Sequence, residues 1–181
     1  MMINFYIRLI FLFIACFFGF QINSCFAKDI ELKKNQIIEL IPETVDVKPG
    51  SSVIVAIKYD VSNNDNTLLG LGARIHYNSS LIEYYSMSNI FNLFKSPVVQ
   101  NDKANFDNDD STDKYILLAW FEWNGKWPGR YLPCNLGEIK FNISDSDISN
   151  NQKALINVTF SSVNPGYHGK AVNTFINIAN E

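Results

Sequence analysis

The chain has 181 residues, of which 47% are hydrophobic and 18% charged, with 15 basic against 18 acidic side chains and a net charge of −3. This length fits one domain that buries a sizeable core. The acidic balance argues against nucleic acid and anionic membrane as partners, because both recruit basic patches.

The N-terminal segment has the features of an export signal. Arg8 is the only charged residue among the first 27, and Leu9–Phe20 is an apolar run of twelve residues. A spanning helix needs about 20 apolar residues, whereas about 10 to 14 suit the centre of a cleaved signal peptide. We therefore expect residues 1–27 to be a signal peptide, cleaved after Ala27, and the mature protein to be secreted, periplasmic or at the cell surface.

Lipidation is the alternative fate of this segment. Ile22-Asn23-Ser24-Cys25 loosely follows the aliphatic, small, small, Cys pattern at which bacterial lipoproteins are cut and acylated, although Asn23 fits it poorly. The mature protein would then be a lipoprotein anchored at Cys25. Membrane contact is thus expected only through the signal peptide or through lipidation at Cys25.

Cysteine use predicts a fold without an internal disulfide. Cys16 and Cys25 leave with the signal peptide, so Cys134 is the single cysteine of the mature chain. A free thiol is most often buried and packs as a small apolar side chain. We expect Cys134 to be buried or half-buried and not to act as a nucleophile.

The mature chain alternates short apolar segments with polar turns, which is typical of β-structure. Residues 28–43 are interpreted as a charged N-terminal leader and a first strand, and residues 44–181 as the main domain. After a Pro-Gly-Ser-Ser turn, four apolar residues alternate with smaller or polar neighbours: Val53, Val55, Ile57 and Tyr59. These residues predict a strand with one buried face.

The segment from Leu69 to Tyr77 predicts a half-buried strand. Its apolar residues alternate with two glycines, then with Arg74 and His76, so one face is apolar and the other carries Arg and His. Glycine weakens a strand unless another backbone comes close, so we expect this strand to bend.

The later segments extend the β pattern. Met87–Phe94 is ambiguous, and we expect a short helical loop or an irregular crossover there. Tyr115–Phe121 is a run of seven apolar residues, rich in aromatics and too short for a core helix, and it predicts a central strand. Further strands are expected near residues 139–143, 156–160 and 172–178. The fold class is therefore all-β, an antiparallel two-sheet sandwich, because no segment suits the helices of parallel crossovers.

The order of several short motifs resembles cohesin-type domains. In that family a Pro-Gly turn opens one strand, and a glycine-marked strand ends in an aromatic, Asn or Asp, two small residues and Leu. The matching segments are Val47–Val53, Leu68–Gly72, Ile75–Ile82, Asp107–Leu118, Ala119-Trp120 and Trp127–Gly129. The resemblance runs from Thr44 to Ile178. It implies a cohesin-like jelly-roll sandwich, related to that of some carbohydrate-binding modules, with a role in attachment to a protein or a polysaccharide.

An acidic stretch offers oxygen ligands for a metal ion. Five aspartates lie within a dozen residues: Asp102, Asp107, Asp109, Asp110 and Asp113. Such loops suit calcium, although the spacing is not that of an EF-hand, because Thr112 stands where a glycine should turn the chain. No cofactor is expected to be required. A structural calcium held by Asp107, Asp109, Asp110 and Asp113 is the candidate, and a solvated acidic loop is the alternative.

A second cluster is aromatic. Trp120 belongs to the apolar strand and is expected in the core, whereas Trp123 and Trp127 flank Asn124-Gly125, a strong hairpin-turn signal. Aromatic rings near a loop tip suit sugar rings or a protein hot spot when hydrogen-bonding groups lie beside them. The predicted ligand-binding residues are Trp123, Asn124, Trp127, Arg130 and Tyr131. Simple packing of the loop is the alternative.

The sequence shows no catalytic motif. Neither His76 nor His168 sits in a zinc-binding pair, and there is no nucleophile elbow, phosphate loop or dinucleotide fingerprint. Glu83 and Glu122 could in principle form a glycosidase pair. We predict no catalytic residues and a protein that is not an enzyme, with a small glycan-active enzyme as an alternative.

The leading hypothesis is a secreted, non-catalytic binding module that recognises a polysaccharide or another secreted or cell-surface protein. The alternative in the structural class is a self-assembling adhesin or envelope subunit whose exposed strands pair with neighbouring copies. Concentration-dependent assembly would distinguish the two.

Overall fold

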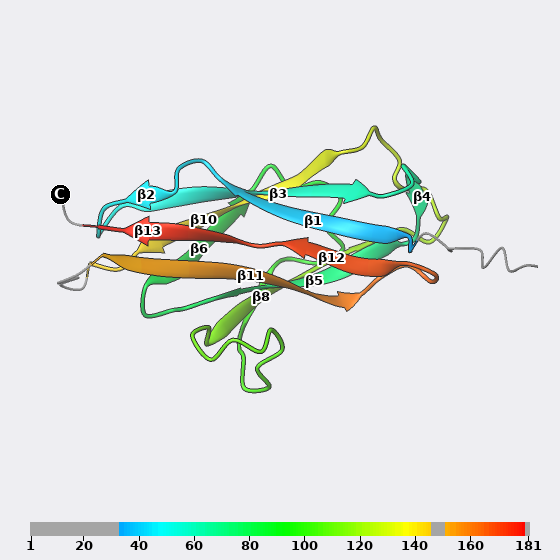
Figure 1. The fold of residues 1–181 in the computed structure, drawn as a ribbon. Coiled ribbons are helices and arrows are strands. Elements are labelled where there is room, and N and C mark those ends of the chain that lie inside the picture. The colour runs from blue at the N-terminus through cyan, green and yellow to red at the C-terminus, as the bar shows by residue number, and fades with distance from the viewer. Residues whose placement is uncertain (1–32, 146–150, 180–181) are drawn as a thin grey trace, which may run out of the picture. The chain divides into compact units, whose positions relative to one another are not determined.

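The computed structural model describes residues 33–145 and 151–179. In these ranges the chain forms strands arranged as two main sheets that lie face to face (Figure 1). None of the described residues belongs to a helix long and apolar enough to cross a bilayer. The signal peptide predicted at residues 1–27, its cleavage site and Cys25 lie outside the described residues and stay predictions.

The first sheet has five strands in the order β12-β1-β3-β10-β6. Its strands are β1 (Asn35–Pro42), β3 (Ser52–Val61), β6 (Ile82–Ser88), β10 (Cys134–Ile143) and β12 (His168–Val172). β1 pairs antiparallel with β3 and parallel with β12. The sequence analysis placed the first strand before a main domain that begins at residue 44. The pairings of β1 make it an integral part of the sandwich.

The second sheet has six strands in the order β2-β13-β11-β5-β8-β7. Its strands are β2 (Asp46–Val47), β5 (Gly70–Tyr77), β7 (Val98–Asn101), β8 (Lys114–Phe121), β11 (Gln152–Ser162) and β13 (Thr174–Ile178). A separate ribbon pairs β4 (Thr67–Leu68) with β9 (Trp127–Pro128). The all-β, two-sheet sandwich is confirmed. Its pairing is antiparallel except where β12 meets β1 and β2 meets β13.

The core follows the period-two pattern of the strands. On β3 the residues that point inward are buried and those between them are half-buried or exposed. Successive side chains of a strand point to opposite faces, so a strand that alternates in sequence buries one face only. The buried residues of β3 are Val53, Val55, Ile57, Tyr59 and Val61. The predicted burial of Cys134 is also confirmed, at 8% exposure, and burial raises the pKa of its thiol.

One buried polar side chain links the two sheets. Gln36 on β1 is fully buried, and its Nε2 donates to the Tyr59 hydroxyl at 2.9 Å and to the Gly70 carbonyl at 3.1 Å. Its Oε1 accepts a hydrogen bond from the Asn164 backbone N–H at 2.6 Å. Gly70 has a φ of 133°, and a Cβ there would collide with the Trp120 carbonyl. The close backbone approach that glycine permits therefore occurs at Gly70.

The segment from Met87 to Phe94 contains no helix. β6 continues to Ser88, and Leu93 then forms an isolated bridge with Trp120. The Phe94 N–H donates to the Ala119 carbonyl at 2.8 Å, so this backbone bonds to β8 rather than to itself. The irregular crossover is confirmed and the helical alternative is wrong.

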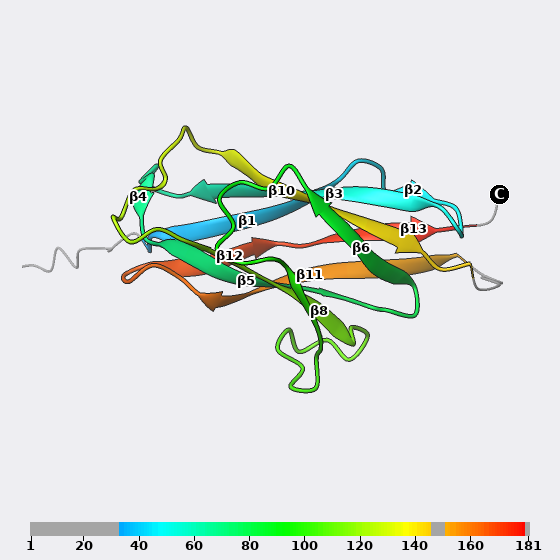
Figure 2. The same cartoon turned by 180° about the vertical axis from the view of Figure 1, so that it is seen from behind.

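The outer face of the second sheet carries the features of functional interest. Ile116, Leu118 and Trp120 point into the core, so the residues that alternate with them on β8 point outward. The outward Tyr115 pairs directly with His76 of β5, which places the histidine on the same face. Residues 102–113, here called the acidic loop, connect β7 to β8 and form the loop that projects beyond β8 in Figure 2.

Candidate functional site

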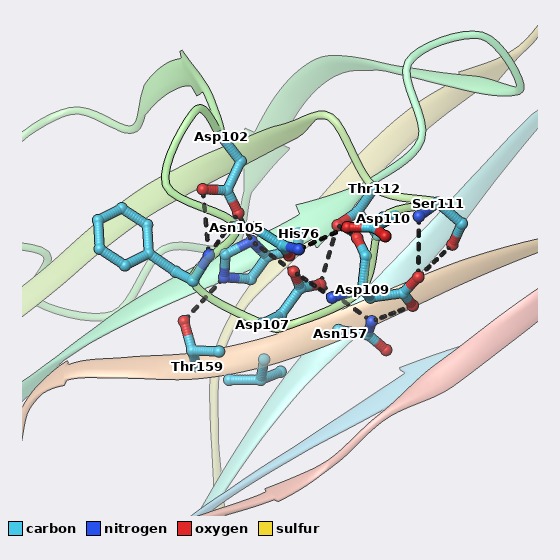
Figure 3. A network of polar contacts seen from close by, with 12 residues as sticks. His76, Asp102, Asn105, Asp107, Asp109, Asp110, Ser111, Thr112, Asn157 and Thr159 are labelled. Atoms are coloured by element: carbon cyan, nitrogen blue, oxygen red, sulfur yellow. Dashed lines mark hydrogen bonds and ion pairs between the residues drawn. The ribbon is translucent and has the colours of Figure 1, made fainter.

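The acidic loop is closed at its base and attached to the second sheet. The Asp102 N–H donates to the Asp113 carbonyl at 2.8 Å, which joins the two ends of the loop. Asn157 of β11 donates from Nδ2 to Asp107 Oδ2 and to Asp109 Oδ2, each at 3.0 Å (Figure 3). The projecting loop is therefore attached to the outer face of the sheet through Asp107 and Asp109.

His76 lies beneath this loop. Its side chain is fully buried, and Nε2 lies 2.7 Å from the Thr159 hydroxyl oxygen. Its other ring nitrogen, Nδ1, lies 2.8 Å from Asp102 Oδ2 and 3.8 Å from Asp107 Oδ1. The side chains of these two aspartates are only 0% and 3% exposed. A strand histidine and two loop carboxylates thus converge out of contact with solvent (Figure 3).

Burial and the neighbouring carboxylates have opposite effects on the pKa of His76. Burial lowers the pKa of His76, while the carboxylates of Asp107 and Asp102 act in the opposite direction. In the same loop, hydrogen bonds from the Ser111 hydroxyl and backbone N–H lower the pKa of Asp109. Hydrogen bonds to a carboxylate favour its ionised form.

The four predicted calcium ligands are not gathered at one point. Asp107 and Asp109 share Asn157, whereas Asp110 accepts a hydrogen bond from Asn105 at 2.7 Å. Asp113 accepts from the Ser79 N–H and hydroxyl, each at 2.6 Å. Hydrogen bonds within the protein thus direct these carboxylates to different partners.

A different set of ligand-type side chains does converge. Among the described residues, His76, Asp102 and Asp107 have ligand atoms that all lie within 4.8 Å of one another. The alternation of β5 placed His76 on the face opposite the core, and Asp102 opens the acidic stretch. Their meeting depends on how the loop folds over the sheet, which no local pattern encodes.

The predicted ligand-binding residues divide between surface and core. Trp123 is 81% exposed and Tyr131 is 96% exposed, and Asn124 and Arg130 are exposed as well. Trp127 is 1% exposed, with its ring centroid 4.6 Å from that of Tyr59. The prediction that Trp127 contacts a ligand is therefore wrong, because the pairing of β9 with β4 turns its side chain into the core.

Trp123 belongs to a group of rings that the sequence did not indicate. Its centroid lies 4.5 Å from that of Phe121 at an interplanar angle of 90°, and Phe94 lies 6.1 Å from Phe121 at 80°. Phe94 is 54% exposed. We call Phe94, Phe121 and Trp123 the aromatic patch. Edge-to-face contacts of this kind hold rings in defined positions.

Glu83 and Glu122 cannot form a glycosidase pair. Glu83 lies 3.3 Å from the ammonium of Lys114, the first residue of β8, whereas Glu122 follows the last residue of that strand. The eight residues of β8 span about 26 Å, but paired glycosidase carboxylates lie within about 5 to 9.5 Å of each other.

Comparison with solved structures decides the type of sandwich. A cohesin of Clostridium acetobutylicum, solved in complex with a dockerin, superimposes with a TM-score of 0.53 at 16% identity, covering 80% of this chain and 100% of that one. The sixth cohesin of scaffoldin B from Acetivibrio cellulolyticus, also bound to a dockerin, gives 0.52 at 17% identity and covers 81% and 99%. The chain has a cohesin-like fold.

A third cohesin structure has a similar fold. The cohesin of a type I cohesin–dockerin complex from Clostridium thermocellum gives a TM-score of 0.50 at 14% identity, covering 81% of this chain and 99% of that one. No family model matches this sequence, and no curated protein matches it. The cohesin-like fold predicted from the order of short motifs is thereby confirmed at the level of structure.

Proposed function

We propose that this protein is a non-catalytic module that binds another secreted or cell-surface protein through the aromatic patch, with Trp123 as the anchor. The observation that carries the proposal is the 81% exposure of Trp123, whose ring meets that of Phe121 edge to face. A large apolar side chain held out in water is unfavourable unless a partner covers it. Tryptophan is also enriched among residues that dominate binding energy.

The aromatic patch is built on a rigid support. Phe121 ends β8, and Phe94 is tied to the same strand by its hydrogen bond to the Ala119 carbonyl. On the same sheet, Val98 of the edge strand β7 pairs with Leu117 of β8 and is 44% exposed. A preformed apolar surface loses little conformational entropy when it binds. These features suit a protein partner with a complementary apolar surface.

The comparisons support the same kind of partner. The cohesins of Acetivibrio cellulolyticus and Clostridium acetobutylicum were solved as complexes with dockerins, and both share this fold. By analogy of fold, we propose a protein module as the partner and an extracellular or cell-surface setting for the interaction.

A polysaccharide is the second candidate ligand. Tyr131 is 96% exposed and stands beside Arg130, whose guanidinium carbon lies 3.7 Å from the ring centroid of Phe91. An exposed ring next to a positioned hydrogen-bond donor suits a sugar. A ligand at this position would depend on Tyr131 rather than on Phe94.

Photo-cross-linking tests the protein-binding proposal. A photoreactive phenylalanine derivative replaces Trp123 in the full chain, expressed in the organism that produces it, and replaces Tyr85 in the control. Tyr85 is 63% exposed on β6 of the other sheet. We expect one protein to be cross-linked from position 123 and not from position 85. The affinity of that purified partner is then measured by calorimetry.

Trp123→Ala is expected to weaken the binding of that partner by about 30-fold, the effect of losing a hot-spot residue, whereas Tyr85→Ala leaves it unchanged. Equal affinity for Trp123→Ala and the wild type would contradict the proposal. Binding of soluble polysaccharides that Tyr131→Ala abolishes would favour the second candidate. Cross-linking only to further copies of the chain would favour self-assembly.

A further inference from the structure

The convergence of His76, Asp102 and Asp107 joins two elements that are far apart in sequence. His76 comes from β5, whereas both aspartates come from the acidic loop. Nδ1 of His76 lies 2.8 Å from Asp102 Oδ2 and 3.8 Å from Asp107 Oδ1. Neighbouring donors around a tetrahedral zinc ion lie about 3.3 Å apart. The three side chains are therefore spaced as the ligands of one ion would be.

The buried histidine nitrogen lacks a hydrogen bond. Nδ1 of His76 lies 2.8 Å from Asp102 Oδ2, at ion-pair distance, and has no hydrogen-bond partner other than this carboxylate among the described residues. The side chain is fully buried, so solvent does not supply a partner. Buried polar atoms without a partner are uncommon and require an explanation. The nitrogen faces two carboxylates, which is the environment of a cation.

The surrounding contacts fix His76 and Asp107 as the outer shell of a metal site would. Nε2 of His76 is engaged by the Thr159 hydroxyl, which leaves the Nδ1 lone pair directed at the carboxylates when Nε2 carries the proton. Oδ2 of Asp107 accepts hydrogen bonds from Asn157 at 3.0 Å and from the Thr112 hydroxyl at 2.9 Å. Its Oδ1 is the atom that faces the histidine. Such partners orient metal ligands and raise their affinity.

We propose that His76, Asp102 and Asp107 bind one divalent transition-metal ion, Zn²⁺ in the first instance, which fastens the acidic loop to the second sheet. One imidazole and two carboxylates form a mixed nitrogen and oxygen donor set, which suits Zn²⁺ and its neighbours. Calcium takes six to eight oxygen ligands, so a site with an imidazole at its centre disfavours it. The ion occupies a buried position and has a structural role.

Metal binding to the full, untagged chain tests this proposal. After removal of metals with a chelator, equilibrium dialysis and elemental analysis measure bound Zn²⁺, Mn²⁺ and Ca²⁺ separately, and a thermal melt records the midpoint. We expect one equivalent of Zn²⁺ and a higher midpoint, because an ion that binds only the folded state stabilises it. Cobalt substitution gives a visible spectrum that reports a nitrogen ligand without any mutation.

Matched variants locate the ion. His76→Gln and Asp107→Asn are expected to weaken Zn²⁺ binding by about 100-fold or more, because each removes a ligand. His168→Gln removes the other histidine, and Asp110→Asn removes a loop carboxylate outside the converging group. Both controls are expected to bind like the wild type. Circular dichroism of each metal-free variant establishes that it is folded.

Three outcomes would overturn the proposal. The first is the absence of Zn²⁺ and Mn²⁺ binding at millimolar concentration, which would leave a buried histidine–aspartate pair only. The second is Zn²⁺ binding lost in His168→Gln and kept in His76→Gln, which would reveal adventitious surface binding. The third is a thermal midpoint that Ca²⁺ alone raises, which would indicate that the loop holds calcium through oxygen ligands only.

Discussion

Two tryptophans that flank one turn have opposite surroundings. Trp127 is 1% exposed and packs against Tyr59, whereas Trp123 is 81% exposed and contacts Phe121 at the surface. Both side chains have the same composition, so any difference between their alanine variants reports surroundings alone. This pair separates the requirement for folding from the requirement for binding.

Trp127→Ala is expected to lower the free energy of unfolding by about 3 to 5 kcal/mol, because it removes a buried ring and leaves a cavity. Trp123→Ala is expected to change it by no more than about 0.5 kcal/mol, as is usual for exposed positions. Urea denaturation of both variants measures the difference. A loss of several kcal/mol in Trp123→Ala would mean that its ring packs into the protein instead.

At the scale of single elements, local patterns predicted the strands well. The alternation around Val53 and around Ile75 fixed which face is buried, because a one-residue shift would expose every apolar side chain. The turn at Asn124-Gly125 was also predictable, but nothing local distinguishes the tryptophans on its two sides. The inward turn of Trp127 depends on β9 pairing with the distant β4.

The candidate site was less predictable than the strands for the same reason. The sequence placed Arg and His on the outer face of β5 and collected aspartates in one loop, and both features are present. It could not indicate that Asp113 turns to Ser79 while Asp102 reaches His76. Which carboxylate meets which partner is set by contacts between residues far apart in the chain.

Gln36 of β1 links that strand to the second sheet through buried hydrogen bonds. Gln36→Met keeps a side chain of similar length but removes the donor to Gly70 and Tyr59 and the acceptor for the Asn164 N–H. We expect the free energy of unfolding to fall by about 1 to 3 kcal/mol, the cost of leaving buried polar groups unsatisfied. Chemical denaturation measures this change.

Ile38→Val is the control for Gln36→Met. Ile38 is a fully buried residue on the same strand, and the loss of one methylene there costs about 0.5 to 1.5 kcal/mol without disturbing a hydrogen bond. If Gln36→Met were as stable as the wild type, the hydrogen bonds of Gln36 would not hold the sheets together.

For the whole molecule, hydrogen-bonded carboxylates determine the response to acid. Asp65 accepts hydrogen bonds from the Thr67 hydroxyl at 2.6 Å and from the Thr67 N–H at 2.9 Å, and these lower its pKa. Asp65 also accepts from the Tyr167 hydroxyl at 2.8 Å, which connects the start of β4 to the turn before β12. Asp109 has a lowered pKa for the same kind of reason.

A carboxyl group with a lower pKa in the folded state binds fewer protons there than in the unfolded chain, so its contribution to stability increases with pH. That contribution is complete above the ordinary carboxyl range and is lost as the pH falls from about 5 to about 2. Thermal midpoints of the chelator-treated protein should therefore fall steeply across this range. Asp65→Asn should reduce the slope, because it removes one of the titrating groups.

Thr67→Ala identifies the cause of the effect, since it keeps the Asp65 charge and removes the hydroxyl that lowers its pKa. We expect this variant to be less stable than the wild type at pH 7 and to approach it as the pH falls from about 5 to about 2, because the contribution of the ionised Asp65 is lost over that range. A constant difference between the two proteins at every pH would show that the hydroxyl acts through packing rather than through the ionised Asp65. The hydrogen bond from the Thr67 hydroxyl at the start of β4 would then have no part in acid denaturation.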